Sequence, residues 1–336
     1  MELLSLSQAV AKQLDRLVFA ALYPKYHRFP FALYNEEQVC LKGQLFPWDD
    51  RFLGNTSIEY EGQRIAIWSV ALDPLPPVPL AASMAHEMFH CFQFEQGEHR
   101  FPDDLRLLNA PIEPDFYRLK LAENRALAVA CRTGDAAEFR RFAALRNERA
   151  VRFPQIAAEE WKAETIEGTA ETVCLRALRE LEPAQYAETL ARYLAKLENE
   201  LPLLFDARRL CYYTGTVLCL TLERLGLPTH NSFSGATLYE QNLPTDAPEE
   251  AALSAFFTEH TQQQQTLIEA HRQAHAFIPC EAAICGYDPM NMVRVGQALY
   301  CSHFLFIRQG ETTRRLDGPV LAQLAPGSDH HITGYC

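Results

Sequence analysis

One long run of helix-forming residues occupies the middle of the chain and limits what it can fold into. From Leu80 to about Leu225 the sequence is rich in Ala, Leu, Arg and Glu, which have strong intrinsic preferences for helix. Glycine and proline divide this run into separate helices. The predicted helices are 80–96, 115–132, 135–150, 156–180, 184–199 and 207–225, and the dividing residues are Gly134, Pro154, Pro183 and Gly226. The centre of the molecule is therefore predicted to be a packed set of helices.

Segments typical of β-strands lie on both sides of this helical run. Before it, branched and aromatic residues form short runs, and Glu61-Gly62 separates the last two as a hairpin turn would. After it, a similar pattern returns beyond a predicted helix at 249–275. The predicted strands are 31–34, 39–41, 56–60 and 64–70 near the N-terminus, and 292–295, 298–301, 304–307 and a segment near Val320 towards the C-terminus.

These patterns predict an α+β fold in three parts. Residues 1–79 are expected to form a helix, at 1–23, and a small β-sheet that ends in the proline-rich segment 73–79. Residues 80–227 form the helical core, and residues 228–336 add a helix and a β-rich region. A chain of 336 residues exceeds one small domain, which agrees with such a division.

Charge and hydropathy exclude several classes of function. The formal net charge is −12, and an acidic surface repels the phosphate backbone of nucleic acids. No stretch of about 18 apolar residues is present, so no membrane-spanning helix is predicted. Charged residues interrupt the amphipathic N-terminal segment, unlike the core of a secretory signal. The ten cysteines contain no CxxC pair and are predicted to be reduced, mostly buried thiols, so we expect a cytoplasmic protein without nucleic-acid or membrane partners.

Residues 86–90 read His-Glu-Met-Phe-His, the pattern HExxH, inside a strongly apolar predicted helix. Residues four apart lie on one helix face about 6 Å from each other, so the side chains of His86 and His90 can converge on one metal ion. Glu87, one step around the helix, can reach a water molecule held by that metal and act as a general base. The alternative is a helix that carries two histidines for ordinary packing.

A further ligand is expected downstream, in the acidic segment ETIEGTAE at 164–171. Glu164, Glu167 and Glu171 fall on one face of a helix at i, i+3 and i+7. Three carboxylates on one face repel one another unless something cationic compensates them, and a metal with histidine ligands would do so. A solvated acidic helix face is the alternative.

HEMFH followed by EGTAE resembles the gluzincin metallopeptidases, the thermolysin-like and aminopeptidase-like branch of the HExxH zinc enzymes. The resemblance covers roughly residues 80–225 and implies a zincin-like catalytic core that binds Zn²⁺. The implied zinc ligands are His86, His90 and Glu167, the implied general base is Glu87, and Glu171 is implied to orient a ligand histidine through a hydrogen bond. The separation of 77 residues between His90 and Glu167 is long compared with many gluzincins, and Glu164 is the alternative third ligand.

The resemblance also implies a tyrosine that donates a hydrogen bond to the developing oxyanion. The segment CYYTG at 211–215 begins an apolar helix about 45 residues after Glu167, a distance comparable to that in aminopeptidase-like gluzincins. Tyr213 is preferred to Tyr212 for this role. The strand at 64–70 is expected to match the zincin edge strand that pairs with an extended substrate. Ordinary core packing is the alternative for the tyrosines and for the strand.

These observations predict a zinc-dependent hydrolase, in the first instance a peptidase that cleaves a peptide or small amide with metal-activated water. A zincin-fold hydrolase of a non-peptide amide or ester would share every proposed site residue and is one alternative. A non-catalytic zinc-binding regulatory protein is the other, and the intact Glu87 argues against it because such a protein needs no base beside the ligands.

Overall fold

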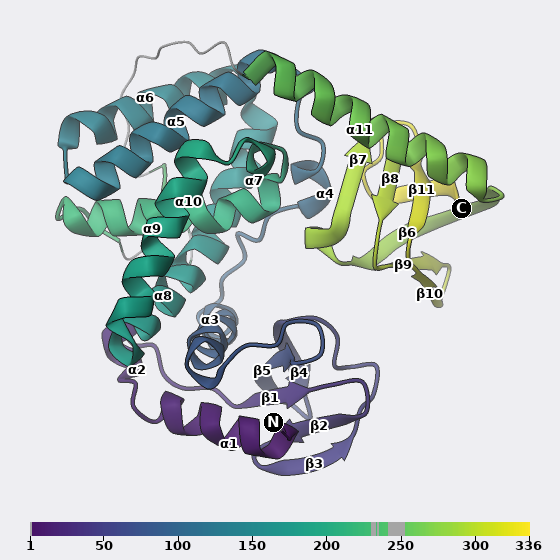
Figure 1. Ribbon diagram of the computed structural model, residues 1–336. Helices are drawn as coiled ribbons and strands as arrows, with labels where there is room; N and C mark the ends of the chain where they lie inside the picture. The colour runs from purple at the N-terminus through teal and green to yellow at the C-terminus, as the bar shows by residue number, and fades with distance from the viewer. Residues whose placement is uncertain (1, 230–232, 234, 241–252) are drawn as a thin grey trace.

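The computed structural model describes residues 2–229, 233, 235–240 and 253–336. Its helices and two β-sheets give the α+β class that the sequence predicts (Figure 1). All ten cysteines are free thiols, and six of them are buried. Across these described ranges, no helix combines the length and the apolar character that a membrane crossing requires.

The N-terminal part contains two helices and a five-stranded sheet, called here the N-terminal sheet. Its elements are α1 (Leu3–Leu14), α2 (Phe19–Leu22), β1 (Phe31–Tyr34), β2 (Gln38–Leu41), β3 (Gln44–Pro47), β4 (Thr56–Tyr60) and β5 (Gln63–Ser69). The strand order is β3-β2-β1-β5-β4, with β1 parallel to β5 and the other neighbours antiparallel. Glu61 and Gly62 both have positive φ, as the predicted hairpin turn between β4 and β5 requires.

Two expectations about this part are corrected by the structure. The helix predicted at 1–23 is broken, because α1 ends at Leu14 and the backbone is extended at Val18 before α2 begins. The strand predicted at 64–70 is not an edge strand, because β5 pairs with β1 on one side and with β4 on the other. The free edge next to it belongs to β4, at the end of the strand order.

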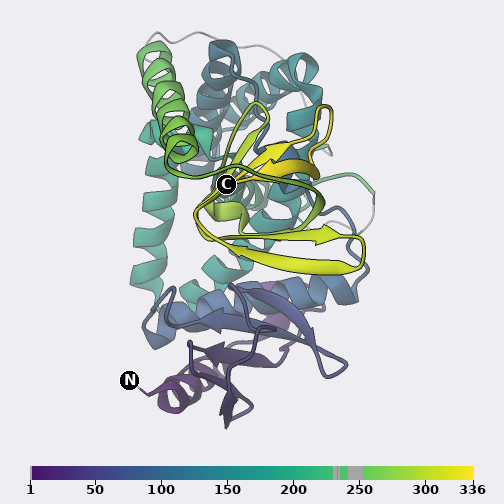
Figure 2. The ribbon, with the colours of Figure 1, turned by 90° about the vertical axis from the view of Figure 1, so that its right-hand side faces the viewer.

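The helical core follows, and prolines begin several of its helices, as they favour the first helical turn. Its elements are α3 (Pro77–Glu95), α4 (Asp104–Leu107), α5 (Pro114–Thr133), α6 (Ala136–Arg152), α7 (Pro154–Ala163), η1 (Glu164–Gly168), α8 (Thr169–Leu181), α9 (Pro183–Asn199), η2 (Leu201–Phe205) and α10 (Ala207–Arg224). Helix α3 lies between the N-terminal sheet and α8 (Figures 1 and 2), so most of its residues are buried.

The predicted helix 156–180 is continuous in the structure but contains a π turn. Helices α7 and α8 are joined by η1, in which the hydrogen bonds widen to the π pattern. Gly168 at the end of this turn packs directly against α10, since a Cβ atom there would lie 2.4 Å from the Cα of Gly215. Two glycines therefore allow the backbones of η1 and α10 to approach closely.

The C-terminal part is a helix and a seven-stranded antiparallel sheet, called here the C-terminal sheet. Its elements are α11 (Leu253–Ala274), β6 (Ile278–Tyr287), η3 (Pro289–Asn291), β7 (Met292–Val295), β8 (Ala298–Cys301), β9 (Phe304–Gln309), β10 (Thr312–Asp317), β11 (Val320–Leu324) and β12 (His331–Tyr335). The strand order is β10-β9-β6-β12-β11-β8-β7. Residues 249–252 of the predicted helix 249–275 lie outside the described residues. Strand β10 was missed because it is exposed almost throughout and shows no apolar alternation.

Candidate metal centre

His86 and His90 of α3 and Glu167 of η1 form a buried group, called here the metal cluster. One ligand-type atom from each lies within 4.8 Å of the others. His86 Nε2 lies 3.1 Å from His90 Nε2, and Glu167 Oε2 lies 3.4 Å and 3.2 Å from these two nitrogens. Tetrahedral ligation with bonds of about 2.05 Å places ligand atoms about 3.3 Å apart. The metal cluster therefore has the dimensions of three corners of a tetrahedral zinc site.

The far side of the His90 ring fixes which of its nitrogens carries the proton. Gln93 donates its amide NH₂ to the carbonyl oxygen of Ile166 at 3.0 Å and to Thr169 Oγ1 at 3.1 Å. Its Oε1 therefore faces His90 Nδ1, at 2.7 Å, and accepts a hydrogen bond from it. With Nδ1 protonated in the neutral ring, Nε2 of His90 presents a lone pair to the metal cluster.

His86 is oriented in the same way. Its Nδ1 donates to Glu171 Oε2 at 2.9 Å, and the other oxygen of Glu171 accepts a hydrogen bond from the Tyr193 hydroxyl. Glu167 Oε2, the third atom of the triangle, is buried, and besides its contacts with the two imidazoles it has no hydrogen-bond partner. Three acceptor atoms thus point at one buried position. A metal cation fits this set of donors, because it satisfies all three at once.

The second oxygen of Glu167 is held by Arg208 of α10. Arg208 Nη2 donates to Glu167 Oε1 at 2.7 Å, and Nε of the same guanidinium lies 2.9 Å from Asp104 Oδ1. Burial opposes ionisation of Glu167, but Arg208 and His90 outweigh it and hold the pKa of this carboxyl well below its usual range. Glu167 is therefore ionised and offers one oxygen to the histidines.

In the metal-free protein the site attracts a proton. Burial acts to lower the pKa of His86, but hydrogen bonds to Glu167 and Glu171 outweigh it and raise that pKa to about 10. A metal must displace this proton when it binds. Burial also raises the pKa of Glu87, against the opposing effect of His86 and His90. A carboxyl group with a raised pKa is suited to proton transfer near neutral pH.

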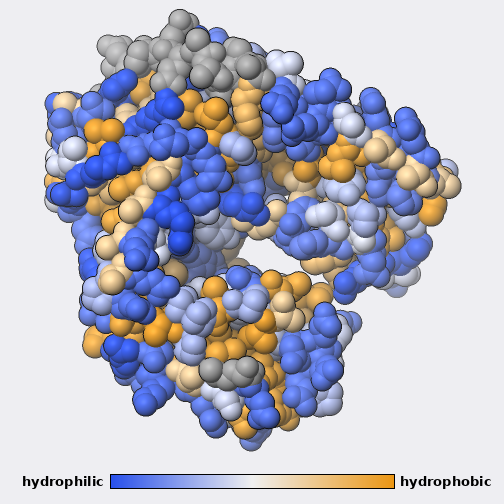
Figure 3. All heavy atoms as spheres, viewed as in Figure 1, coloured by the Kyte–Doolittle hydropathy of each residue, from blue (hydrophilic) through white to orange (hydrophobic). Residues whose placement is uncertain are grey.

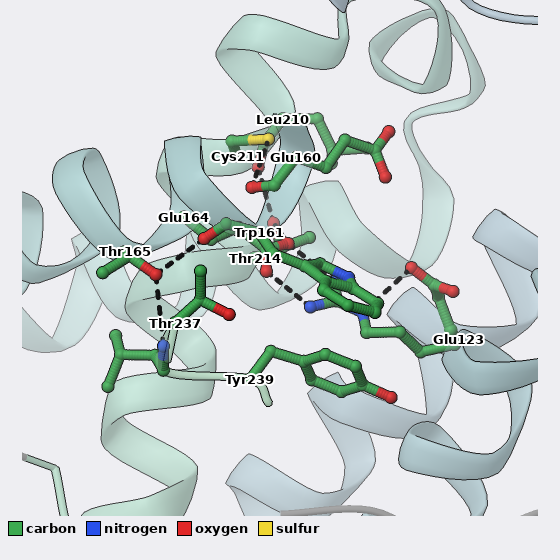
Figure 4. A network of polar contacts seen from close by, with 12 residues as sticks. Glu123, Glu160, Trp161, Glu164, Thr165, Leu210, Cys211, Thr214, Thr237 and Tyr239 are labelled. Atoms are coloured by element: carbon green, nitrogen blue, oxygen red, sulfur yellow. Dashed lines mark hydrogen bonds and ion pairs between the residues drawn. The ribbon is translucent and has the colours of Figure 1, made fainter. Parts of the chain in front are cut away.

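Glu164, the alternative third ligand, is engaged elsewhere. It accepts hydrogen bonds from Arg146 Nη2 at 2.7 Å and from Thr214 Oγ1 at 2.6 Å. Figure 4 shows Glu164 and Thr214 within the polar network of this region. It does not share a face with Glu167 and Glu171 as expected, because the π turn that begins at Glu164 changes the helical phase. The ion-pair network to which it belongs consists of Lys120, Glu123, Arg146, Arg149, Glu160 and Glu164, each at most 3% exposed.

The two candidate tyrosines of α10 have different surroundings. Tyr212 stacks on His86, with ring centroids 5.8 Å apart and ring planes 6° apart. Burial raises the pKa of Tyr212 well above its usual range, so its hydroxyl stays protonated. Tyr213, the sequence-based choice, packs edge-on against Tyr193 instead, with centroids 4.7 Å apart. Adjacent helix positions face about 100° apart, so only one of the two can face His86 in this way, and it is Tyr212.

The metal cluster borders a cleft of about 1370 Å³ between the N-terminal and C-terminal sheets. Figure 3 shows this cleft as a hollow between the two parts. Glu87, His90, Glu167 and Tyr212 all line it, together with Thr56 and Ser57 of the edge strand β4 and residues of η3. A general-base candidate, two of the three metal-cluster residues and an edge strand therefore share one accessible space.

Apart from Glu171, which the resemblance implied and which contacts His86 Nδ1, sequence reasoning missed the residues that orient the ligands. Gln93 follows His90 by three positions, and Arg208 precedes Tyr212 by four. Such spacings place two side chains on one helix face, so the sequence indicated that each pair could lie together. Asp104 and Tyr193 come from other elements, and no local pattern connects them to the motif. These contacts depend on how α4, α9 and α10 pack.

No protein-family model, curated protein or solved structure matches this chain.

Proposed function

We propose that this chain is a cytoplasmic, zinc-dependent hydrolase of the gluzincin type, and that it acts as a peptidase. The observation that carries the proposal is the metal cluster, in which three convergent acceptor atoms lie 3.1–3.4 Å apart. Two of these atoms come from an HExxH segment, and its glutamate, Glu87, lines the same cleft. Ordinary packing of two histidines does not require a buried carboxylate oxygen that faces the Nε2 atoms of both.

Each neighbouring residue has a definite part in the proposed reaction. Bound Zn²⁺ supplies Lewis-acid chemistry, polarising a carbonyl and lowering the pKa of water. Glu87 takes the proton from the attacking water and delivers it to the leaving nitrogen. Tyr212 donates a hydrogen bond to the carbonyl oxygen as negative charge develops there. Glu171 and Gln93 keep the histidines in the tautomer that presents Nε2.

A peptide is favoured over other amides and esters by the position of β4. The outer edge of this strand is not paired within the N-terminal sheet, and Thr56 and Ser57 line the cleft. Backbone groups at a free edge can pair with an extended chain, whereas a small ester offers no such ladder. A purely regulatory zinc protein is disfavoured, because burying a carboxyl such as Glu87 costs free energy and a protein that only binds zinc needs no base beside its ligands.

The test combines zinc analysis with activity on quenched fluorescent peptides and on a matched panel of small esters and amides. Glu87→Gln should keep the wild-type zinc content and lose about 10²–10⁴-fold in kcat. Tyr212→Phe should lose about 10²-fold in kcat with zinc unchanged, while Tyr213→Phe serves as the matched control and stays near wild type. Wild-type protein that binds no zinc, or Glu87→Gln protein with full activity, would refute the proposal.

A further inference from the structure

Two exposed aromatic side chains stack against each other on the wall of the cleft. Phe94 is 39% exposed and Phe101 is 36% exposed, and both line the cleft that borders the metal cluster. Their ring centroids lie 4.8 Å apart with the planes 21° from parallel. This pair, called here the aromatic ledge, places apolar surface in water at the cleft.

The aromatic ledge lies close to the second histidine ligand. Phe94 follows His90 by four residues on the same helix, α3, so the two side chains are neighbours on one helix face, about 6 Å apart at Cβ. When the scissile carbonyl of a substrate lies at the metal cluster, the side chain of a neighbouring substrate residue must therefore lie close to Phe94. The ledge is within reach of a residue that flanks the cleaved bond.

The aromatic ledge packs against an arginine side chain of the N-terminal sheet. The Arg64 guanidinium carbon lies 3.9 Å from the Phe94 ring centroid. The Arg64 guanidinium and the Phe101 ring both lie in contact with the Phe94 ring. Two groups at such distances cannot occupy the same face of the ring, so they cover opposite faces. Arg64 belongs to β5, an interior strand of the N-terminal sheet, so the stack is anchored to a rigid element. The face of Phe101 that points away from Phe94 remains as contact surface.

The loop that carries Phe101 is also fixed, by a buried ion pair. Arg100 donates to Glu98 from Nε at 2.9 Å and from Nη2 at 2.6 Å, and its Nη1 donates to the carbonyl oxygen of Ala236 at 2.8 Å. The side chains of Glu98 and Arg100 are only 1% and 7% exposed. Phe101 follows directly after this anchor. An exposed ring on so constrained a loop loses little conformational entropy when a ligand packs on it.

We propose that the aromatic ledge is a specificity subsite that binds a bulky apolar side chain, above all an aromatic one, of the substrate residue next to the scissile bond. The inference rests on the proposed peptidase function and adds the class of substrate to it. Stacking on a preformed aromatic surface favours aromatic ligands, and exposed apolar surface at a cleft is typical of a binding site. Phe94 and Phe101 thus act on substrate selection, not on metal binding.

The test measures peptide binding by the full-length, zinc-loaded Glu87→Gln protein, in which turnover of the probe is strongly slowed. The probes are fluorescein-labelled, end-capped alanine peptides that differ only in one central residue, which is Phe or Gln. We expect the Phe peptide to bind about tenfold more tightly than the Gln peptide. Phe94→Ala and Phe101→Ala, added to this background, should remove most of that preference and leave zinc content unchanged. Val151→Ala is the matched control, since Val151 is 75% exposed on α6 and does not line the cleft.

Equal binding of the two peptides, or a preference that survives in both ledge variants, would overturn the inference. Cleavage of peptides by the wild-type protein reports separately on the proposed function. Hydrolysis without any dependence on the aromatic ledge would reject the subsite and keep the peptidase. A preference that depends on the ledge without hydrolysis would keep the subsite and reject the peptidase.

Discussion

Two buried clusters of charged side chains lie along one continuous helix, α7–η1–α8, and they differ in charge balance. In the ion-pair network, three cations meet three carboxylates, and each carboxylate has a basic partner within hydrogen-bonding distance. Around the metal cluster, four carboxylates gather, from Glu87, Asp104, Glu167 and Glu171, and the Arg208 guanidinium pairs with two of them. The first cluster is complete in itself, whereas the second has an excess of negative charge that a metal ion would neutralise.

The difference shows why burial of charge does not by itself mark a functional site. Glu164 and Glu167 are three residues apart, and both are at most 5% exposed. Glu164 has its full set of partners, which is what a structural role requires. Glu167 directs its Oε2 at two imidazole nitrogens. That arrangement of ligand-type atoms, not the buried charge, distinguishes the metal cluster.

The largest effect is expected from breaking the balanced cluster. Arg149 is fully buried and contacts Glu123 at 2.7 Å and Glu160 at 2.6 Å, so Arg149→Met leaves two buried carboxylates short of a cation. The free energy of unfolding of the zinc-free protein should fall by about 3–5 kcal/mol in urea denaturation. Arg132→Met, which removes an ion pair of a 49% exposed arginine, is the control and should cost about 0–1 kcal/mol. Equal costs for the two variants would contradict the account of the network.

The next largest effect is expected from widening the contact between η1, which carries Glu164 and Glu167, and α10. A Cβ atom at Gly168 would meet the Cα of Gly215 at 2.4 Å, so Gly168→Ala forces η1 away from α10. We expect a loss of about 1–3 kcal/mol in the free energy of unfolding and weaker zinc binding, because Glu167 moves with η1. Gly215→Ala should behave alike, since its Cβ would lie 2.6 Å from the Glu164 carbonyl oxygen. Wild-type zinc affinity in both variants would show that this contact does not position Glu167.

A smaller effect is expected when a ligand is left in place but loses its support. Glu171→Gln keeps an oxygen that can accept from His86 Nδ1 and removes the charge. Zinc affinity, measured by competition with a chromogenic chelator, should fall by about tenfold, the lower end of the range for such supporting residues. Glu198→Gln alters a carboxylate paired with an exposed arginine and should leave the affinity unchanged. If both variants bind zinc alike, the negative charge of Glu171 does not support the ligand.

The smallest change in folding stability is expected on mild acidification. Burial of Glu160 acts against ionisation, but Arg149 and Lys120 lower its pKa to about 2. Its contribution to folding is therefore present above the ordinary pKa of about 4.5 and is lost only as the pH falls towards 2. The part of the free energy of unfolding that the ion-pair network contributes through Glu160 should change by less than about 1 kcal/mol between pH 7 and 5. Zinc affinity should fall over the same range, because protons compete for His86, whose pKa is raised to about 10.

Urea denaturation and zinc retention, measured on the same samples at each pH, check this separation. Unfolding that coincides with zinc release would show that the two clusters do not titrate independently.

Local sequence patterns were sufficient for the long helices of the core, for the hairpin turn at Glu61-Gly62 and for the pairing of His86 with His90. Each depends on residues within a few positions of one another, where helical periodicity or turn chemistry decides the outcome. The proximity of Glu167 to the histidines was expected from the EGTAE segment, and the metal cluster bears out that proximity.

The remaining features depend on tertiary contacts that no local pattern specifies. The π turn is accompanied by the approach of Gly168 to Gly215, and it separates Glu164 from Glu167. The same packing sets the rotation of α10 and thereby places Tyr212, not Tyr213, on His86. The interior position of β5 follows from pairing with β1, which precedes it by about 30 residues.

The most direct measurement is zinc content per chain in the wild-type protein, Glu167→Gln and Glu164→Gln, each purified without a histidine tag and exposed to excess zinc before dialysis. The two substitutions are chemically identical and lie three residues apart. We expect about one zinc in the wild-type protein and in folded Glu164→Gln, and almost none in Glu167→Gln. Zinc retained by Glu167→Gln at the wild-type level, or absent from the wild-type protein, would contradict the claim that the unpartnered oxygen of Glu167 completes a metal site.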